Sequence, residues 1–282
     1  LKGMCRILKQ YTHNSIHLVT PFDSGGSSAK LRHAFDMPAI GDLRSRLMAL
    51  ADETVLGHPE IYRLFTYRLP CDLKPKKLRA RLLDMIEAND PLVDDIANPM
   101  RSLICNQLGF FFDRMPADFD LRGASIGNLI LSGGYLNGQN NLDQIIFLFS
   151  KLVNVHGTVR AIVNDNLHLG ANLVDGQQVI GQHNLTGKEV APLTSPIKNL
   201  FLAASHSDPT KSDANLLNKN RKLIEKAELI CYPMGSFYSS LIANLLPKGV
   251  PSAIMQNRNP KVYVPNLGVD PEQVGMTLQQ SI

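Results

Sequence analysis

The chain has 282 residues and a formal net charge of +4, with 44% hydrophobic and 19% charged residues. This balance is typical of a globular protein with one large domain, and it excludes a disordered chain. The sequence has no apolar run of about 20 residues, which excludes an integral membrane protein. The mild charge and the lack of Trp disfavour a nucleic-acid-binding surface. The four cysteines are too scattered for a zinc site, so we interpret them as reduced, mostly buried thiols of a cytoplasmic protein: Cys5, Cys71, Cys105 and Cys231.

The first 52 residues predict a helix, a strand and a second helix. Apolar residues at helical spacing predict a helix over 1–8, and a short apolar run predicts a strand over 15–20. The stretch 20–43 is too rich in Gly, Ser and Pro for a helix interior, and the helical pattern returns at 43–52. A helix and strand with no strand ahead of them lead us to expect a leading strand and loop upstream, and the pattern at 275–282 resembles a helix cut short.

The middle of the chain changes in character. From 57 to about 122 it is rich in Lys, Arg and Leu and then in aromatic residues, which predicts a mostly helical insertion. The basic run at 74–81 is interpreted as the solvated face of an insertion helix, with an anionic partner as the alternative. Two further helices are predicted at 125–135 and 142–153.

The remainder of the chain alternates strands with helices. Asp175 and Gly176 form a strong hairpin-turn signal between two short apolar runs. The elements predicted here are strands at 158–162, 167–173, 178–180, 229–231 and 261–264, and helices at 214–227 and 237–246. Such alternation indicates one α/β domain over 1–282 with a mainly parallel sheet and the helical insertion at about 57–122.

Four segments place small or polar residues at strand-to-helix turns, where open α/β sheets bind ligands. The first follows the strand predicted at 15–20 and comprises Asp23, Ser24, Gly25, Gly26, Ser27 and Ser28. Its glycines let backbone amides approach an anion closely, and its hydroxyls add donors. Asp23 is suited to bind a metal or a sugar hydroxyl. A mobile Gly-Ser loop without a ligand is the alternative interpretation.

The second and third segments each open a predicted helix. In the second, Gly41 precedes Asp42, which is suited to cap the helix. Arg44 in the first turn is unfavourable for the helix dipole and suits a bidentate contact to phosphate or carboxylate. In the third segment, Asn128 either directs its amide at a substrate or base, or only forms a hydrogen bond at the helix start.

The fourth segment, 234–240, follows the strand predicted at 229–231. A Gly-Ser turn at Gly235 and Ser236 leads into a helix, an arrangement that predicts an anion-binding helix N-terminus. The alternative is that Ser236 is a simple N-cap.

Other catalytic chemistry has little support in the sequence. The motifs Gly-x-Ser-x-Gly, HExxH and GxxxxGK[ST] are all absent. The histidines are dispersed, and we interpret His168 and His183 as surface or core residues and not as ligands.

These motifs together resemble the CofD / YvcK-like superfamily, which includes 2-phospho-L-lactate transferase and the gluconeogenesis factor. The resemblance depends on VTPFDSGGSSAKLR, MPAIGDLR, SIGNLILSG, LVNVHGTVRAIVND, MGSFYSSLIANLLPKG and KVYVPNL. It covers nearly the whole chain outside the insertion. The chain is more similar to the YvcK-like branch, whose motif reads DDGGSSGxLR followed by PPGDIR.

The resemblance implies a Rossmann-like fold, with helices on both faces of the sheet, that binds nucleotide-containing ligands. The transferase branch moves a phospholactyl-type group from a guanosine diphosphate donor to a deazaflavin alcohol, with magnesium, and releases GMP. The YvcK branch binds nucleotide sugars such as UDP-N-acetylglucosamine and acts in carbon metabolism and cell shape. This sequence departs from the family at Ser24, where the motif has its second Asp, at Met234, where it has Gly, and at Gln182, where it has an acidic residue.

The resemblance predicts a nucleotide-diphosphate-binding transferase with Asp23, Asp42 and Arg44 as catalytic residues and Mg²⁺ on Asp23. The predicted ligand-binding residues are Ser24, Gly25, Gly26, Ser27, Ser28, Arg32, Gly41, Asn128, Gly235, Ser236, Tyr238 and Ser239. A non-catalytic nucleotide-sugar regulator is the alternative, and a scaffold acting through the basic insertion is a third hypothesis. We expect a cytoplasmic protein, a homodimer by family resemblance, with no nucleic-acid or membrane partner.

Overall fold

The computed structural model describes residues 1–187, 190–205, 208 and 210–281. These residues form two compact units, each described here by itself. The helical unit comprises Lys2–His17 and Gly26–Arg160, and the sheet unit comprises Leu1, Leu18–Gly25 and Ala161–Ile282. The mixed α/β class is confirmed, whereas the single domain over 1–282 and the Rossmann-like arrangement stay predictions.

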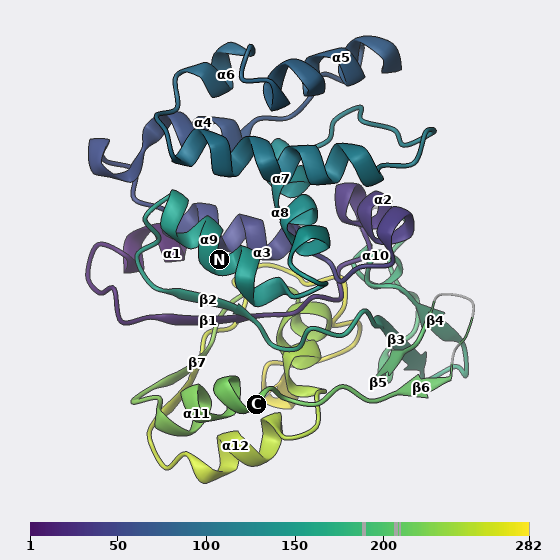
Figure 1. Ribbon diagram of the computed structural model, residues 1–282. Coiled ribbons are helices and arrows are strands. Elements are labelled where there is room, and N and C mark those ends of the chain that lie inside the picture. The colour runs from purple at the N-terminus through teal and green to yellow at the C-terminus, as the bar shows by residue number, and fades with distance from the viewer. Residues whose placement is uncertain (188–189, 206–207, 209, 282) are drawn as a thin grey trace. The chain divides into compact units, whose positions relative to one another are not determined.

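Helices predominate in the helical unit (Figure 1). They are α1 (Lys2–Leu8), α2 (Gly26–Phe35), α3 (Gly41–Leu50), α4 (Pro59–Thr66), α5 (Pro75–Ile86), α6 (Pro91–Asp94), α7 (Met100–Arg114), α8 (Ile126–Asn137) and α9 (Leu142–Leu152). The predicted helices at 1–8, 43–52, 125–135 and 142–153 are confirmed, as is the helical character of the insertion. Three insertion helices begin with Pro, whose fixed φ suits the first helical position: Pro59, Pro75 and Pro91.

The prediction that 20–43 lacks a helix interior is wrong, because α2 occupies part of that stretch. The glycines and serines that suggested a loop lie at the start of α2, where Gly26 adopts a φ of +50°. The residues that follow, from Ala29 to Arg32, are good helix formers. Turn-forming residues therefore mark the beginning of this helix and not its absence.

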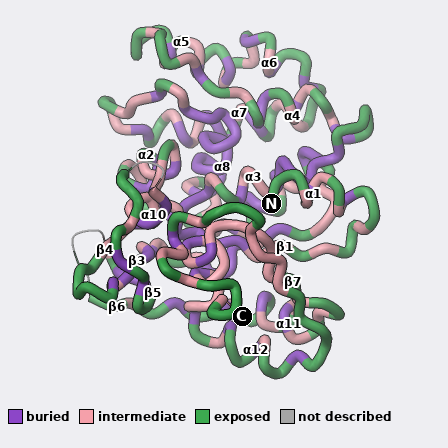
Figure 2. Tube along the Cα trace, turned by 180° about the vertical axis from the view of Figure 1, so that it is seen from behind, coloured by how far each residue is buried: buried purple, intermediate pink, exposed green. Residues whose placement is uncertain are grey.

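The core of the helical unit is built around α8. Its residues are buried from Ile126 to Tyr135, and Figure 2 shows the buried path running through α7 and α8. A Cβ atom at Gly133 would overlap the Gln107 carbonyl oxygen of α7, so the missing side chain lets the two helices pack closely. The helix is apolar on most sides because neighbouring helices surround it.

The strands lie in three small sheets. The largest is ordered β4-β3-β5-β6, from β3 (His168–Leu173), β4 (Gln178–Ile180), β5 (Ile197–Ala203) and β6 (Lys211–Ser212). The others pair β1 (Ile16–Val19) with β2 (Thr158–Ala161) and β7 (Ile230–Tyr232) with β8 (Lys261–Tyr263). Each strand predicted from the sequence is present, including the hairpin, in which Gly176 has a φ of +91°.

The sheets differ from the mainly parallel sheet that we predicted. The pairings of β3 with β4 and β5, and of β5 with β6, are all antiparallel, whereas β7 and β8 are parallel. The tight turn between β3 and β4 leaves no room for a crossover helix, so these strands must run in opposite directions. β5 was not predicted, because its run of Lys198 and Asn199 breaks the apolar pattern.

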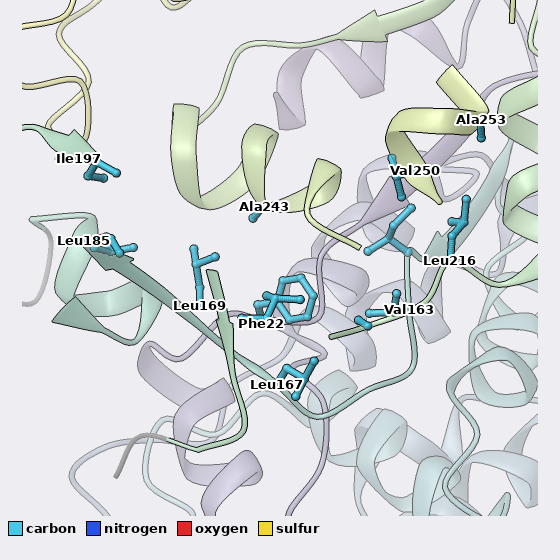
Figure 3. Close-up of a cluster of buried hydrophobic side chains, with 14 of the residues drawn as sticks. Phe22, Val163, Leu167, Leu169, Leu185, Ile197, Leu216, Ala243, Val250 and Ala253 are labelled. Atoms are coloured by element: carbon cyan, nitrogen blue, oxygen red, sulfur yellow. The ribbon is translucent and has the colours of Figure 1, made fainter. Parts of the chain in front are cut away.

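The core of the sheet unit includes the fully buried Phe22. Figure 3 shows Phe22 beside Val163, Leu167 and Leu169, with Leu216 and Val250 in the same cluster. Three short helices complete the unit: α10 (Gln182–Leu185), α11 (Asn218–Lys226) and α12 (Val250–Gln256). The helix predicted at 237–246 is a π-helical turn at Phe237–Leu241 followed by a 3₁₀ helix at Ile242–Leu245.

Two expectations from composition have different outcomes. The four cysteines are free, but the prediction that they are mostly buried is wrong, since Cys71 and Cys231 are exposed and only Cys5 is fully buried. Cys71 lies outside the predicted elements, whereas Cys231 lies in the strand predicted at 229–231, whose residues Ile230–Tyr232 are not fully buried. None of the described helices is both long and apolar enough to span a membrane.

Candidate functional site

Three residues that the sequence singled out in separate segments meet at the start of α8. Asn128 Oδ1 accepts a hydrogen bond from Arg44 Nε at 2.8 Å, and Asn128 Nδ2 donates to Ser27 Oγ at 3.0 Å. Asn128 is 1% exposed. Its amide therefore joins α2 to α3 and fixes the orientation of the Arg44 guanidinium, which leaves the remaining guanidinium nitrogens for a ligand.

Gly127 makes room for the Arg44 side chain. A Cβ atom at Gly127 would lie 2.5 Å from the Phe65 carbonyl oxygen and 2.9 Å from Arg44 Cδ. The first of these contacts is to backbone and cannot rotate away. Glycine at this position is thus required for the close approach of α4 and of the Arg44 stem to α8.

The electrostatics of Arg44 are unusual for a guanidinium. Its pKa is lowered to about 10, mainly by burial and then by the positive charge of Arg68, against a smaller opposing effect of Asp42. Arg68 forms no ion pair among the residues that the structure describes. Two guanidinium groups that repel each other beside a buried amide favour an anion between them.

The ends of the insertion bring further cations to this site. Arg68 forms an isolated antiparallel bridge with Ser125, the Leu69 amide donates to the Ala124 carbonyl oxygen, and the Gly123 amide donates to the Leu69 carbonyl oxygen. Next to this pairing lies a cavity of about 260 Å³, hereafter the Arg122 pocket. It is lined by Gly26, Ser27, Lys30, Leu31, Arg68, Phe119, Asp120, Arg122, Gly123, Ala124, Ser125, Asn128 and Leu129.

Sequence reasoning missed all four charged residues that line this pocket: Lys30, Arg68, Asp120 and Arg122. Arg68 and Arg122 lie near the two ends of the insertion, which must be close together in space if the insertion leaves the rest of the fold intact. The closeness of the two ends could therefore have placed Arg68 and Arg122 near each other. The sequence analysis interprets the insertion as one helical segment and does not pair its ends.

The other predicted residues of α2 and α3 take no part in the hydrogen bonds that join Arg44, Asn128 and Ser27. Ser28 and Arg32 are buried on α2, at 3% and 5% exposure. Asp42 is exposed in the first turn of α3, where Gly41 is the first residue and Ile40 the N-cap, without a side-chain hydrogen bond. The alternative interpretation of Asp42 as a helix cap is therefore wrong, because the N-cap lies two residues earlier.

The first part of the DSGGSS segment belongs to the sheet unit. Asp23 Oδ1 accepts a hydrogen bond from the Gly25 amide at 3.0 Å. Ser24 Oγ lies 2.8 Å from His183 Nδ1 and accepts from the His183 amide at 3.3 Å. Ser24 Oγ thus contacts both the ring and the backbone of His183, and the direction of the ring contact follows the imidazole tautomer. The interpretation of His183 as a simple surface or core residue missed this pair.

The turn at 234–239 is also in the sheet unit, and several of its backbone amides already have acceptors. Asn266 accepts from the Gly235 amide at 3.0 Å, and Asp270 accepts from the Phe237 amide at 2.7 Å. Glu272 Oε2 accepts from the Tyr238 and Ser239 amides at 2.9 and 2.8 Å, and Oε1 accepts from Ser239 Oγ at 2.5 Å. The chain's own side chains thus occupy the positions that an anion would take.

Glu272 is 1% exposed, and its burial raises the pKa of the carboxyl group. The hydrogen bonds from Ser239 oppose this shift, and the negative charge of Asp270 adds to it. A ligand role for Gly235, Ser236, Tyr238 and Ser239 stays a prediction, and it would require this segment to move.

The predicted magnesium site has one candidate ligand in the sheet unit, Asp23. Among the residues that the structure describes, no three His, Cys, Asp or Glu side chains gather as a metal-binding group. Mg²⁺ is commonly held by one or two carboxylates together with substrate phosphates. The described residues alone therefore do not make a magnesium site, and the metal stays a prediction that depends on a bound phosphate.

Comparison with known proteins identifies the family of the chain. The family model described as 2-phospho-L-lactate transferase CofD matches residues 1–282. The gluconeogenesis factor of Bacillus subtilis is 26% identical over 272 residues, which cover 95% of this chain and 66% of that protein. A Clostridium acetobutylicum relative is 26% identical over 272 residues, covering 96% of this chain and 47% of that protein. The chain thus spans between about half and two thirds of these relatives.

A solved structure has a similar fold. The crystal structure of a UPF0052 family member from Bacillus halodurans is 27% identical and superposes with a TM-score of 0.70. The match covers 99% of this chain and 70% of that one. Sequence and structure therefore agree on the relatives of this chain.

Proposed function

The chain belongs to the family of 2-phospho-L-lactate transferase CofD, and from this premise we propose that it binds a nucleotide diphosphate, with phosphate oxygens held by Arg44. Asn128 positions the Arg44 guanidinium from one side, and Ser27 extends the same hydrogen-bond chain. A planar guanidinium fork matches the geometry of phosphate, as it does that of carboxylate.

The observation that carries this proposal is the charge of Arg68 acting on the partly buried Arg44. Holding two like charges near a buried site without a bound anion is costly, because the protein interior screens them poorly. A phosphate group between them converts repulsion into two charge-assisted hydrogen-bonding contacts. A bound phosphate would therefore stabilise a site that contains both arginines.

For the reaction we propose transfer of a phosphorus-linked group with release of GMP. Such transfers depend mainly on positioning and on charge stabilisation of the phosphoryl oxygens. Arg44 supplies that charge. Asp23 is proposed to orient the acceptor hydroxyl or to contribute to a Mg²⁺ site completed by ligand phosphates, and Asp42 is proposed to act with Arg44.

A second candidate function is a nucleotide-sugar-binding regulator without turnover. Two observations favour it: several relatives are named gluconeogenesis factors, and Ser24 stands where the family motif has a carboxylate. Ser24 forms a hydrogen bond with His183, so the position is used structurally in this chain. Loss of one carboxylate weakens the case for metal-dependent transfer more than the case for binding.

The test is a titration of the full chain with GDP and with UDP-N-acetylglucosamine, followed by a turnover assay with a guanosine diphosphate donor, a deazaflavin acceptor and magnesium. The transferase proposal expects GDP binding and GMP release that disappears in Asp23→Ala and after chelation of magnesium. Tight UDP-sugar binding without turnover supports the regulator. If neither nucleotide binds, both proposals are wrong.

A further inference from the structure

Two histidines from distant parts of the chain stack on each other in the helical unit. His13 lies between α1 and β1, and His156 lies between α9 and β2. Their ring centroids are 3.9 Å apart, and the ring planes are inclined by 25°. The stack therefore joins the segment that follows α1 to the segment that precedes β2.

The charged groups around His156 come from three segments. Asp52, which follows α3, is 6% exposed, and its Oδ2 lies 3.7 Å from His156 Nε2. Lys9, which directly follows α1, is 9% exposed and lies 2.9 Å from Glu53 Oε1. Burial lowers the pKa of His156, and the positive charges of His13 and Lys9 lower it further, whereas Asp52 opposes the shift. The folded chain therefore favours neutral His156.

A third histidine, His17, lies in β1 on the same segment. Its Nε2 lies 3.1 Å from Ser15 Oγ. Burial lowers the pKa of His17 from 6.5 to about 4, and the positive charge of Arg46 on α3 adds to the shift. A Cβ atom at Gly157 would lie 2.8 Å from Ser15 Oγ, so the residue after His156 packs against this segment too. Both His17 and His156 thus favour the neutral form in the folded state.

The helix α1 depends on its neighbours for its position. A helix of seven residues is marginal by itself, and α1 packs on α3 with Cys5 1% exposed (Figure 1). Arg46 Nη1 donates to Cys5 Sγ at 2.6 Å, and Arg6 Nη2 donates to the Tyr62 hydroxyl at 3.0 Å. The histidine contacts follow at the C-terminal end of α1. Their loss would free that end of the helix and give solvent access to Cys5.

We propose that His13, His17 and His156 form an acid-sensitive latch, hereafter the histidine latch, which holds α1 on α3 at neutral pH and releases it when the imidazoles are protonated. Two charged imidazoles at stacking distance repel each other, and Lys9 adds a further positive charge against the single carboxylate of Asp52. Release moves the imidazoles into water, which screens these charges. The inference goes beyond the proposed function and does not depend on it, since no ligand takes part.

The direction of the pH dependence follows from the neutral preference of His17 and His156. Both have a folded pKa below the ordinary value of 6.5, so the released segment binds more protons than the docked segment. The latch is therefore closed above about pH 6.5 and weakens as the pH falls below that value, toward the folded pKa of about 4 for His17. Because one pKa unit corresponds to about a tenfold change in an equilibrium, release should become at least about tenfold more favourable by about pH 5.

The experiment measures the labelling rate of each cysteine of the full chain at pH 7.5 and pH 5. The reagent is 4,4′-dithiodipyridine, which reacts with thiols at both pH values, and mass spectrometry assigns the labelled sites. Cys71 is exposed and supplies the reference rate at each pH. Cys105, whose thiol donates to the Met85 carbonyl oxygen at 3.4 Å, reports on the helical unit away from the latch.

The rate of Cys5 labelling relative to Cys71 should rise at least about tenfold at pH 5, while the rate of Cys105 relative to Cys71 stays constant. Protection of Cys5 at both pH values would overturn the proposal. A parallel rise for Cys5 and Cys105 would also overturn it, because acid would then unfold the helical unit as a whole.

Three variants separate the latch from a general effect of acid. His156→Gln and His13→Gln each remove one of the two stacked charges, so the acid-induced rise of Cys5 labelling should be several-fold smaller. His33→Gln is the matched control, because His33 is an exposed histidine of α2 in the same unit and lies outside the latch. An equal rise in His156→Gln and His33→Gln contradicts the proposal. His13 is exposed, so His13→Gln keeps the test available if His156→Gln fails to fold.

Discussion

The start of α8 and the turn at 234–239 were predicted from the same kind of pattern, a small-residue turn opening a helix. In the turn, the Gly235, Phe237, Tyr238 and Ser239 amides have acceptors from Asn266, Asp270 and Glu272. At the start of α8, by contrast, the Ser125 hydroxyl has no partner among the described residues, and the positive charge of Arg68 lowers the pKa of Arg44.

The difference concerns what satisfies the hydrogen-bonding groups of a polar site. Side chains of the chain itself satisfy them in the turn, whereas groups at the start of α8 are left for an external ligand. A carboxylate supplied by the chain removes the free energy that an external anion would gain, so such a turn is stabilised and closed. A site with surplus cations and a hydroxyl without a partner remains unfavourable until a ligand binds. The two regions should therefore respond in opposite ways to loss of their polar groups.

The largest expected effect is from Glu272→Ala in the closed turn. The substitution leaves two amides and one hydroxyl without an acceptor in a buried position, at about 1–3 kcal/mol each. We expect the free energy of unfolding to fall by about 3 kcal/mol or more, measured by urea denaturation. Glu272→Gln is the matched control, because its carbonyl oxygen still accepts both amides. Equal losses in the two variants would show that the hydrogen bonds are not the cause.

A smaller loss of stability is expected from Gly127→Ala at the start of α8. Its Cβ would lie 2.5 Å from the Phe65 carbonyl oxygen, so α4 and α8 must move apart at a cost of about 1–3 kcal/mol. The shift also moves the Arg44 stem, so affinity for GDP should fall. Gly268→Ala serves as the control, since a Cβ at that residue meets nothing within 4 Å. A stable Gly127→Ala variant with normal GDP affinity would refute the packing role of Gly127.

Arg68→Gln should weaken GDP binding by roughly tenfold, the loss of one charge-assisted contact. The free protein should be unchanged or slightly more stable, since the repulsion with Arg44 is relieved. Lys76→Gln changes the same charge at an exposed position of α5 that does not line the Arg122 pocket. If both variants lower GDP affinity equally, the effect is one of net charge and not of this site.

The smallest effect is a pH dependence of stability from Glu272. Burial raises the pKa of this carboxyl in the folded state above its ordinary value of 4.5. The folded chain therefore binds a proton that the unfolded chain has lost, so stability decreases as pH rises from about 4.5 through the folded pKa. Comparing denaturation of wild type and Glu272→Gln across this range isolates the contribution. A pH slope that persists in the Gln variant must come from other groups.

Local signals predicted much of the fold. Alternation and turn residues located both hairpin strands around Asp175 and Gly176, and helical spacing located α3, α8 and α9. Two of the missed elements, α2 and β5, have a local signal that opposes the outcome. Turn formers mask the beginning of α2, and polar residues in β5 interrupt its apolar run. In both cases tertiary packing outweighs local preference.

The candidate site was predicted in part for a different reason. Ser27, Arg44 and Asn128 were recognised because a charged or polar side chain at a helix start suggests a ligand. Arg68 and Arg122 were missed because only the pairing of the insertion's two ends brings them to the pocket. Glu272 was missed because an acceptor more than 30 residues along the chain from Tyr238 leaves no local pattern.

The most direct test of the central claim is a GDP titration of the wild-type chain, Arg44→Lys and Arg44→Gln at fixed ionic strength. We predict at least a tenfold loss of affinity in both variants, since lysine keeps the charge but lacks the planar fork that Asn128 orients. Affinity for GDP that stays at the wild-type value in Arg44→Gln would contradict the assignment of the α8 start as the phosphate site.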